Sequence, residues 1–188
     1  MDRQGFQKGR VAAISAVHFV HDCYTSFLAP ALPLIIEKLG ISYGLTGVLA
    51  VIQRIPSLFN PFIGIIAERP VMRYMVIFSP SFTAFFMSLI GVAPSYTFLA
   101  VILFCSGISS TLWHIPTPVM VKQLSGTRTG KGMSYYMVGG ELARTAGPLI
   151  ILGVISLWGL EGTWKMMPLG FVASLVLYLN FRNARLQP

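Results

Sequence analysis

The chain has 188 residues, of which 54% are hydrophobic and only 11% charged, and its formal net charge is +8. Soluble domains carry about 25% charged residues, and a soluble chain of this length could not bury so much apolar surface in one core. The composition therefore excludes an ordinary soluble domain and indicates that lipid is the main solvent. The basic residues lie in short clusters between long apolar runs, so no basic patch for nucleic acid is expected.

Six apolar runs follow one another along the chain, separated by short linkers that contain Gly or Pro. A helix that spans a bilayer needs about 20 mostly apolar residues. The runs that meet this length are roughly 11–36, 45–67, 74–93, 97–121, 134–158 and 164–181. No linker is long enough to be a domain, and the ten-residue alternation of membrane strands is absent. The sequence predicts an all-α integral membrane protein, a single bundle of six transmembrane helices over residues 1–188.

Lys and Arg residues are distributed unevenly between the two sides of this topology. One side carries only Lys38 and Lys165. The other side carries the basic residues of both tails and of the second and fourth linkers: Arg3, Lys8, Arg10, Arg69, Arg73, Lys122, Arg128, Lys131, Arg182 and Arg185. The positive-inside rule then predicts that both termini lie in the cytoplasm, with the chain in the inner membrane.

Several ionisable residues lie inside the apolar runs, where they are costly and usually face a polar cavity or a partner. We take them as candidate substrate-binding or proton-coupling residues: His18, His21, Asp22, Arg54, His114, Glu141 and Arg144. No nucleophile–base pair, nucleotide loop or paired catalytic carboxylates accompany them, so we do not expect an enzyme or a cofactor.

His18 and Asp22 are four residues apart and therefore share one helical face. A carboxylate beside an imidazole can exchange a proton. A proton-coupling or substrate-binding role for Asp22 is one interpretation, and a static His–Asp hydrogen bond is the other.

The remaining candidate residues have structural interpretations as well as functional ones. Arg54 has no acid three or four residues away, so it pairs with Asp22 or Glu141 across the bundle or contacts a substrate anion. Glu141 and Arg144 are three apart, which favours an internal salt bridge. His114 alone is typical of a core histidine.

Metal-capable side chains also gather here, namely His18, His21, Asp22, Cys23 and His114. Their spacing lacks a second paired motif, so we do not expect a metal site.

Small residues recur at four-residue spacing in the fifth run, at Gly139, Ala143 and Gly147. Such a ridge lets a second helix approach closely, so we expect helix packing along it.

The linker between the second and third runs reads Gly64-Ile-Ile-Ala-Glu68-Arg69-Pro-Val-Met-Arg73. This stretch resembles the signature loop of the major facilitator superfamily, although Glu replaces the commoner Asp and the internal Gly is missing. The resemblance implies that Glu68 and Arg69 form a cytoplasmic latch, supported by Arg73. The alternative is an ordinary basic loop with one acid.

Further stretches resemble the fosmidomycin-resistance branch of that superfamily. They are residues 14–22 with Pro33, 107–114, 125–130, 138–140 and 147–148. Members of the branch are twelve-helix, proton-coupled exporters of small molecules. Members also place an acid and an arginine soon after the histidine of the fourth helix, and residues 115–119 contain neither. Arg54, Glu141 and Arg144 stand where the family pattern is usually uncharged, so the polar site is altered.

The resemblance covers only the N-terminal half of such a transporter. A lone half would expose Asp22, Arg54 and Glu141 to lipid, so the sequence predicts a second six-helix unit. We favour a different chain as that unit, with a homodimer or a truncated form of a longer protein as the alternatives. The function predicted is a half-size subunit that moves a small anionic solute by alternating access, coupled to protons or to sodium. A non-transporting membrane subunit or assembly factor, and an intramembrane metal-binding protein, are the other interpretations.

Overall fold

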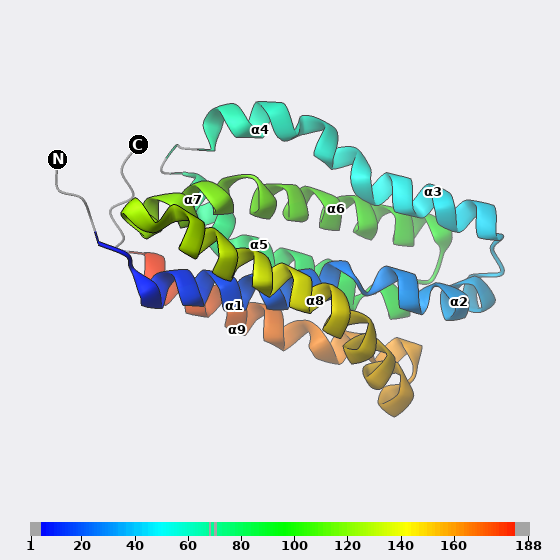
Figure 1. Cartoon of the computed structure of the whole chain (residues 1–188). Helices are drawn as coiled ribbons and strands as arrows, with labels where there is room; N and C mark the ends of the chain where they lie inside the picture. Colours follow the sequence, from blue (N-terminus) through cyan, green and yellow to red (C-terminus); the bar gives the residue numbers. More distant parts are fainter. Residues whose placement is uncertain (1–4, 68, 70, 183–188) are drawn as a thin grey trace.

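The computed structural model describes residues 5–67, 69 and 71–182. Within these residues the chain is helical, without strands, and its helices lie side by side in an elongated bundle (Figure 1). The predicted all-α class is confirmed for this part of the chain.

The first predicted run forms two helices, α1 (Lys8–Thr25) and α2 (Leu28–Leu39). Pro30 lacks the N–H that would bond to the Ser26 carbonyl, and its ring crowds that carbonyl. The helix therefore breaks about one turn after Asp22, which lies near the middle of the run.

The second run is broken twice, into α3 (Tyr43–Arg54), the 3-10 helix η1 (Ile55–Phe59) and α4 (Asn60–Ile66). Pro56 and Pro61 occupy the first turn of η1 and of α4, where a missing N–H costs least. The prolines thus set both breaks.

The third run is α5 (Met72–Ser88), which ends in the 3-10 helix η2 (Ile90–Val92). The next helix, α6 (Tyr96–His114), begins after Ser95, whose hydroxyl accepts the N–H of Phe98 at 3.2 Å. This N-cap fixes the start of α6.

A break also separates α6 from α7 (Pro116–Ser125), at Ile115. Ile115 keeps helical backbone angles, but Pro116 lacks the N–H that would bond to the Leu112 carbonyl, which accounts for the position of the break. The 3-10 helix η3 (Gly126–Arg128) begins with a positive φ of 53°, and α8 (Thr129–Trp158) then runs back past α7 and against α1 (Figure 1).

The last described elements are the 3-10 helix η4 (Leu160–Met166) and α9 (Met167–Phe181). The Lys38 ammonium donates to the Gly91 carbonyl at 2.8 Å and to the Glu161 carboxylate at 2.9 Å. This contact joins α2, η2 and η4 at one end of the bundle.

Five helical segments of the described chain are long and apolar enough to cross a membrane, whereas the sequence predicted six. They are Lys8–Leu39, Tyr43–Ile66, Met72–Val92, Tyr96–Trp158 and Leu160–Phe181. The six-helix count is therefore not confirmed by length and composition. The longest segment contains both the fourth and the fifth predicted runs.

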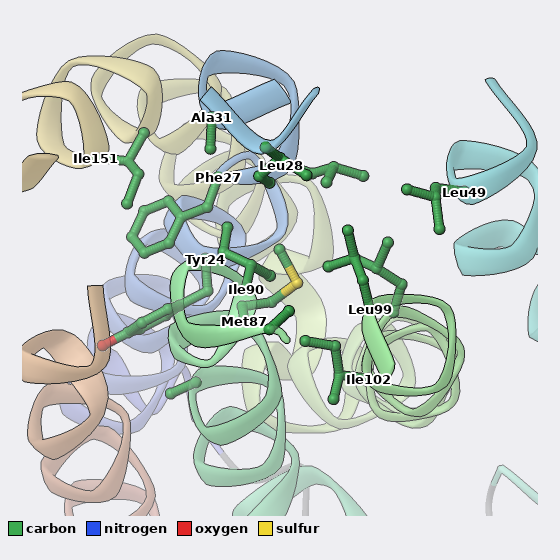
Figure 2. Packing of buried hydrophobic residues seen from close by; sticks show 14 of the residues in the cluster. Tyr24, Phe27, Leu28, Ala31, Leu49, Met87, Ile90, Leu99, Ile102 and Ile151 are labelled. Atoms are coloured by element: carbon green, nitrogen blue, oxygen red, sulfur yellow. The ribbon is translucent and has the colours of Figure 1, made fainter. Parts of the chain in front are cut away.

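The apolar interior gathers around the break between α1 and α2. Tyr24 and Phe27 pack there with Met87 and Ile90 (Figure 2). The Tyr24 hydroxyl also donates to the Met166 carbonyl at 2.5 Å. Because lipid gives helices no hydrophobic drive to associate, close packing and hydrogen bonds such as these hold the bundle together.

The small-residue ridge of α8 packs against α1, as predicted. A Cβ at Gly139 would overlap the Ser15 carbonyl oxygen, and a Cβ at Gly147 would overlap the Ser26 hydroxyl. Ala143, between them, is fully buried. The two helices approach closely because these positions are small.

The first and last helices meet at one end of the bundle, where the Arg10 guanidinium lies 6.0 Å from the Phe181 ring centre. The described basic residues of the predicted cytoplasmic side lie at this end (Figure 1): Lys8, Arg10, Arg69, Arg73, Lys122, Arg128, Lys131 and Arg182. Arg3 and Arg185 lie outside the described residues.

Candidate functional site

The carboxylate of Asp22, on α1, is surrounded by all three histidines of the sequence. Its Oδ2 lies 3.1 Å from Nε2 of His18. Its Oδ1 lies 2.9 Å from Nδ1 of His21 and 3.3 Å from Nε2 of His114, on α6. We call these four residues the Asp22 centre. Of the three histidines, only His18 was predicted from the sequence to lie beside Asp22.

Most of the Asp22 centre is shielded from the surroundings. His18 and Asp22 are 4% and 6% exposed, and His21 is fully buried. The His114 side chain is 39% exposed. A buried carboxylate is costly unless it is paired and hydrogen-bonded, and among the described residues it is imidazole rings that pair with it.

Two features of the backbone position the centre. The break at Pro116 leaves His114 as the last residue of α6. On α8, a Cβ at Gly140 would lie 2.7 Å from His18 Cε1 and 3.3 Å from Asp22 Oδ2. Only glycine leaves room there for the His18 and Asp22 side chains.

Aromatic rings hold two of the imidazoles. The His18 ring stacks on Tyr136 with ring centres 3.9 Å apart, and its Nδ1 lies 2.8 Å from the Tyr136 carbonyl oxygen. The His21 ring stacks on Trp113 at 5.1 Å. Trp113 lay in a stretch that carried the family resemblance, whereas nothing in the sequence singled out Tyr136.

A chain of hydroxyl groups leads away from His21 into the bundle. His21 Nε2 lies 3.0 Å from Thr83 Oγ1. The Thr83 hydroxyl donates to Ser109 Oγ at 2.8 Å, and the Ser109 hydroxyl donates to the Ser79 carbonyl at 2.8 Å. The sequence analysis missed Thr83 and Ser109, because such side chains in helices commonly bond to their own backbone.

A pocket of about 220 Å³ opens beside the centre. His18, Asp22 and His114 line it together with Glu141 and Arg144 of α8. A small ligand placed in this pocket would lie within reach of both the Asp22 carboxylate and the charges of Glu141 and Arg144.

The other candidate charges do not join the centre. Glu141 and Arg144 form the internal salt bridge that their spacing favoured, at 2.8 Å, with side chains 58% and 69% exposed. Arg54 is exposed at the end of α3. In the described part of the chain its guanidinium forms no ion pair, so its pairing with Asp22 or Glu141 is wrong: histidines and Arg144 surround those acids instead.

The latch residues are only partly described. Glu68 lies outside the described residues. Gly64 lies on α4 and Arg69 in the bend after it, while Arg73 donates to the Tyr74 hydroxyl at 3.3 Å. The latch remains a prediction.

The donor atoms of His18, Asp22 and His114 lie within 4.8 Å of one another, close enough to hold a metal ion. Cys23 is not part of this group and packs in the apolar interior. The same donor atoms can bind protons.

Long apolar helices around a buried, ionisable centre define the class of multi-pass membrane proteins. Asp22, Arg54 and Glu141 all lie near the middle of long apolar segments. Carriers commonly bind substrate and coupling ions at that depth.

The chain belongs to the Major Facilitator Superfamily, whose family model matches residues 14–187. It is 24% identical over 152 residues to the fosmidomycin resistance protein of Escherichia coli (strain K12), covering 80% of this chain and 37% of that protein. It is 21% identical over 170 residues to YfnC, an uncharacterized MFS-type transporter of Bacillus subtilis (strain 168), covering 88% and 41%. No solved structure matches the chain.

These relatives confirm the resemblance drawn from the sequence, to the superfamily and to the fosmidomycin-resistance branch. Membership agrees with a multi-pass membrane protein, as the long apolar helices indicate. The chain spans about two fifths of the length of the curated relatives that it matches.

Proposed function

We propose that the chain forms a six-helix half of a secondary active transporter that moves a small anionic solute coupled to protons. The observation that carries the proposal is the Asp22 centre, a buried carboxylate among three histidines in a chain from a transporter family. Ionisable groups inside a membrane commonly mark a substrate or ion path. Histidine and aspartate together can bind and release protons near neutral pH.

We count six membrane crossings in one bundle over residues 1–188. The segment Tyr96–Trp158 has 63 residues, and a straight helix of that length would measure about 95 Å, against about 30 Å of hydrocarbon. The turn at Gly126 divides it into α6–α7 and α8, each of crossing length. Six crossings return the chain to the side on which it began.

A second six-helix unit would cover the charged face of this bundle. Arg54, Glu141 and Arg144 are exposed near the middle of apolar segments, where contact with lipid is costly. In this superfamily two parallel halves hold the substrate between them. We favour a different chain as the second unit; a second copy of this chain and a further part of the same polypeptide are the alternatives.

An anionic solute fits the unpaired cation at this face. Arg54 has no ion-pair partner among the described residues, whereas Glu141 is neutralised by Arg144. A guanidinium binds carboxylate and phosphate groups well because its donors match their geometry. Alternating access would then expose the pocket beside the Asp22 centre to each side in turn.

The basic end of the bundle would face the cytoplasm, with the chain in the inner membrane. With Cys23 and Cys105 replaced by alanine, cysteines introduced at Lys122 and Lys165 test this orientation. In spheroplasts an impermeant maleimide should label Lys165→Cys, and label Lys122→Cys only after the membrane is disrupted. The opposite pattern would invert the topology.

Reconstitution tests the transport proposal as a whole. We expect the assembly, purified from native membranes with its subunits, to have at least twice the 20.6 kDa mass of the chain. In vesicles an imposed pH gradient should drive a radiolabelled small organic anion, and not a cation of similar size. Transport by a monomer alone would overturn the proposal of a second six-helix unit. A larger assembly that moves none of a broad anion panel would favour a non-transporting subunit.

A further inference from the structure

The hydrogen bonds around the Asp22 centre fix which nitrogen of His18 carries a proton. His18 Nδ1 lies 2.8 Å from the Tyr136 carbonyl oxygen, which can only accept. Nδ1 therefore carries the N–H, and in the neutral ring Nε2 carries the lone pair. That Nε2 is the atom 3.1 Å from Asp22 Oδ2.

The tautomer of His21 is fixed through two hydroxyl groups. Ser109 gives its hydrogen to the Ser79 carbonyl, and Thr83 gives its hydrogen to Ser109. Thr83 can then only accept from His21, so Nε2 of His21 carries the N–H. In the neutral ring the lone pair lies on Nδ1, 2.9 Å from Asp22 Oδ1.

Both histidines thus present a lone pair to an ionised Asp22. Two acceptors at this distance repel each other, and the repulsion is strong where water is excluded. His18 Nε2 is buried 3.1 Å from Asp22 Oδ2 and has no hydrogen-bond partner in the described part of the chain. Each contact becomes favourable once a proton occupies it, on the ring or on the carboxylate.

His114 differs from the other two rings. No hydrogen bond among the described residues fixes its tautomer, so its Nε2–H can donate to Asp22 Oδ1, 3.3 Å away, without an added proton. The number of contacts that need an added proton is therefore two.

We infer that the Asp22 centre is a two-proton site, with one proton bound between His18 and Asp22 and a second between His21 and Asp22. Thr83 and Ser109 are positioning residues, because they hold His21 in the tautomer that requires the second proton. The inference deepens the proposed function by giving the number of coupling ions. It rests on that function only for the statement that these protons move with the solute.

With both protons bound, the centre and the charges that face it together favour the binding of an anion. Emptied of both protons the centre carries one negative charge, and filled it carries one positive charge. From α8 it is faced by the uncharged phenol of Tyr136 and by Glu141, which Arg144 neutralises. From α5 it is faced by the Thr83 hydroxyl. The pocket beside the filled centre is therefore positive overall.

Nitrogen NMR of ring-¹⁵N-labelled histidine in lipid nanodiscs tests the inference directly. The three histidines of the sequence all belong to the centre, so each signal reports on it, and single His→Gln variants assign them. At alkaline pH we expect His18 with Nδ1–H and His21 with Nε2–H. A neutral His18 with Nε2–H, or a neutral His21 with Nδ1–H, would overturn the two-proton site, because that contact would be satisfied without an added proton.

Proton uptake by purified variants gives the second readout. Thr83→Val keeps the shape of the side chain but frees His21 to turn Nδ1–H to Asp22, so acidification should load one proton fewer than in wild type. Thr163→Val is the matched control, because Thr163 is equally buried and its hydroxyl donates to the Ser88 carbonyl far from the centre. If Thr83→Val does not fold, Ser109→Ala should have the same effect, because Thr83 can then donate to His21. Uptake equal to wild type in the variant that folds would contradict the role of the hydroxyl chain.

Two further results distinguish the two-proton site from a metal site and from the proposal of proton-coupled transport. Zinc that shifts the histidine signals at stoichiometric concentration would overturn it, since the lone pairs would then serve a metal. Unchanged signals would support protons. If the tautomers are as expected but solute moves independently of pH, the coupling proposal fails while the two-proton site stands.

Discussion

Replacement of Asp22 by Asn is expected to abolish proton-driven transport while the protein still folds and reaches the membrane. The amide has nearly the shape of the carboxylate, and its NH₂ group can donate to the lone pair of His18 or His21. The fold should therefore persist. Asn carries no negative charge and binds no proton near neutral pH, so the centre can no longer exchange protons with the two sides of the membrane.

The measurement is solute accumulation in vesicles with an imposed pH gradient, alongside the amount of protein in the membrane. The variant should not accumulate solute against its gradient, whereas the wild type does. Glu37→Gln makes the same carboxylate-to-amide change at an exposed position on α2, away from the centre, and should leave coupling unaffected. Coupling that persists in Asp22→Asn would rule out this carboxylate as the proton site.

The membrane helices were predictable because lipid imposes a strong rule on sequence. A spanning segment must be long and apolar, so the runs stand out without any knowledge of packing. The breaks were less predictable, although their cause is visible in the sequence. Pro30 and Pro116 both interrupt a run, whereas Pro80 lies inside α5 without ending it. Whether a proline breaks a helix depends on neighbours that satisfy the freed carbonyl, and those neighbours come from the fold.

The candidate site was predictable only as far as a single helix allows. His18 and Asp22 follow from four-residue spacing, because one helical face brings them together. His114 contacts the same carboxylate from another helix, nearly a hundred positions along the chain, and no local sequence pattern predicts that contact. The hydroxyl chain through Thr83 was missed for the same reason.

For the charged residues near the middle of the segments, the sequence left more than one role open. Arg54 was expected to pair with an acid across the bundle or to contact an anion, and spacing could not choose between them. The fold removes the first possibility because Asp22 is already surrounded by histidines. What remains is a cation at membrane depth that requires something to face it, whether a solute or a second bundle.

Replacement of Gly139 by Ala is expected to destabilise the bundle by about 1–3 kcal/mol, because the added methyl overpacks the contact between α8 and α1. The atom that the methyl would meet is the Ser15 carbonyl oxygen, with the Phe19 backbone nitrogen 3.4 Å away. Backbone atoms inside a helix cannot turn aside as a side chain can. The two helices must therefore separate or shift.

Unfolding in mixed detergent micelles measures this effect, and α8 supplies the control. Gly153 lies on the same helix, but a Cβ there would meet nothing within 4 Å, so Gly153→Ala should leave stability unchanged or raise it. Gly140→Ala separates stability from function, because its methyl would meet the movable side chain of His18. That variant should lose less stability than Gly139→Ala yet disturb the histidine signals of the centre. Equal stability of Gly139→Ala and Gly153→Ala would mean that α8 does not rest on α1 at this ridge, and the contacts of His18 with Tyr136 and Gly140 of α8 would lose their structural basis.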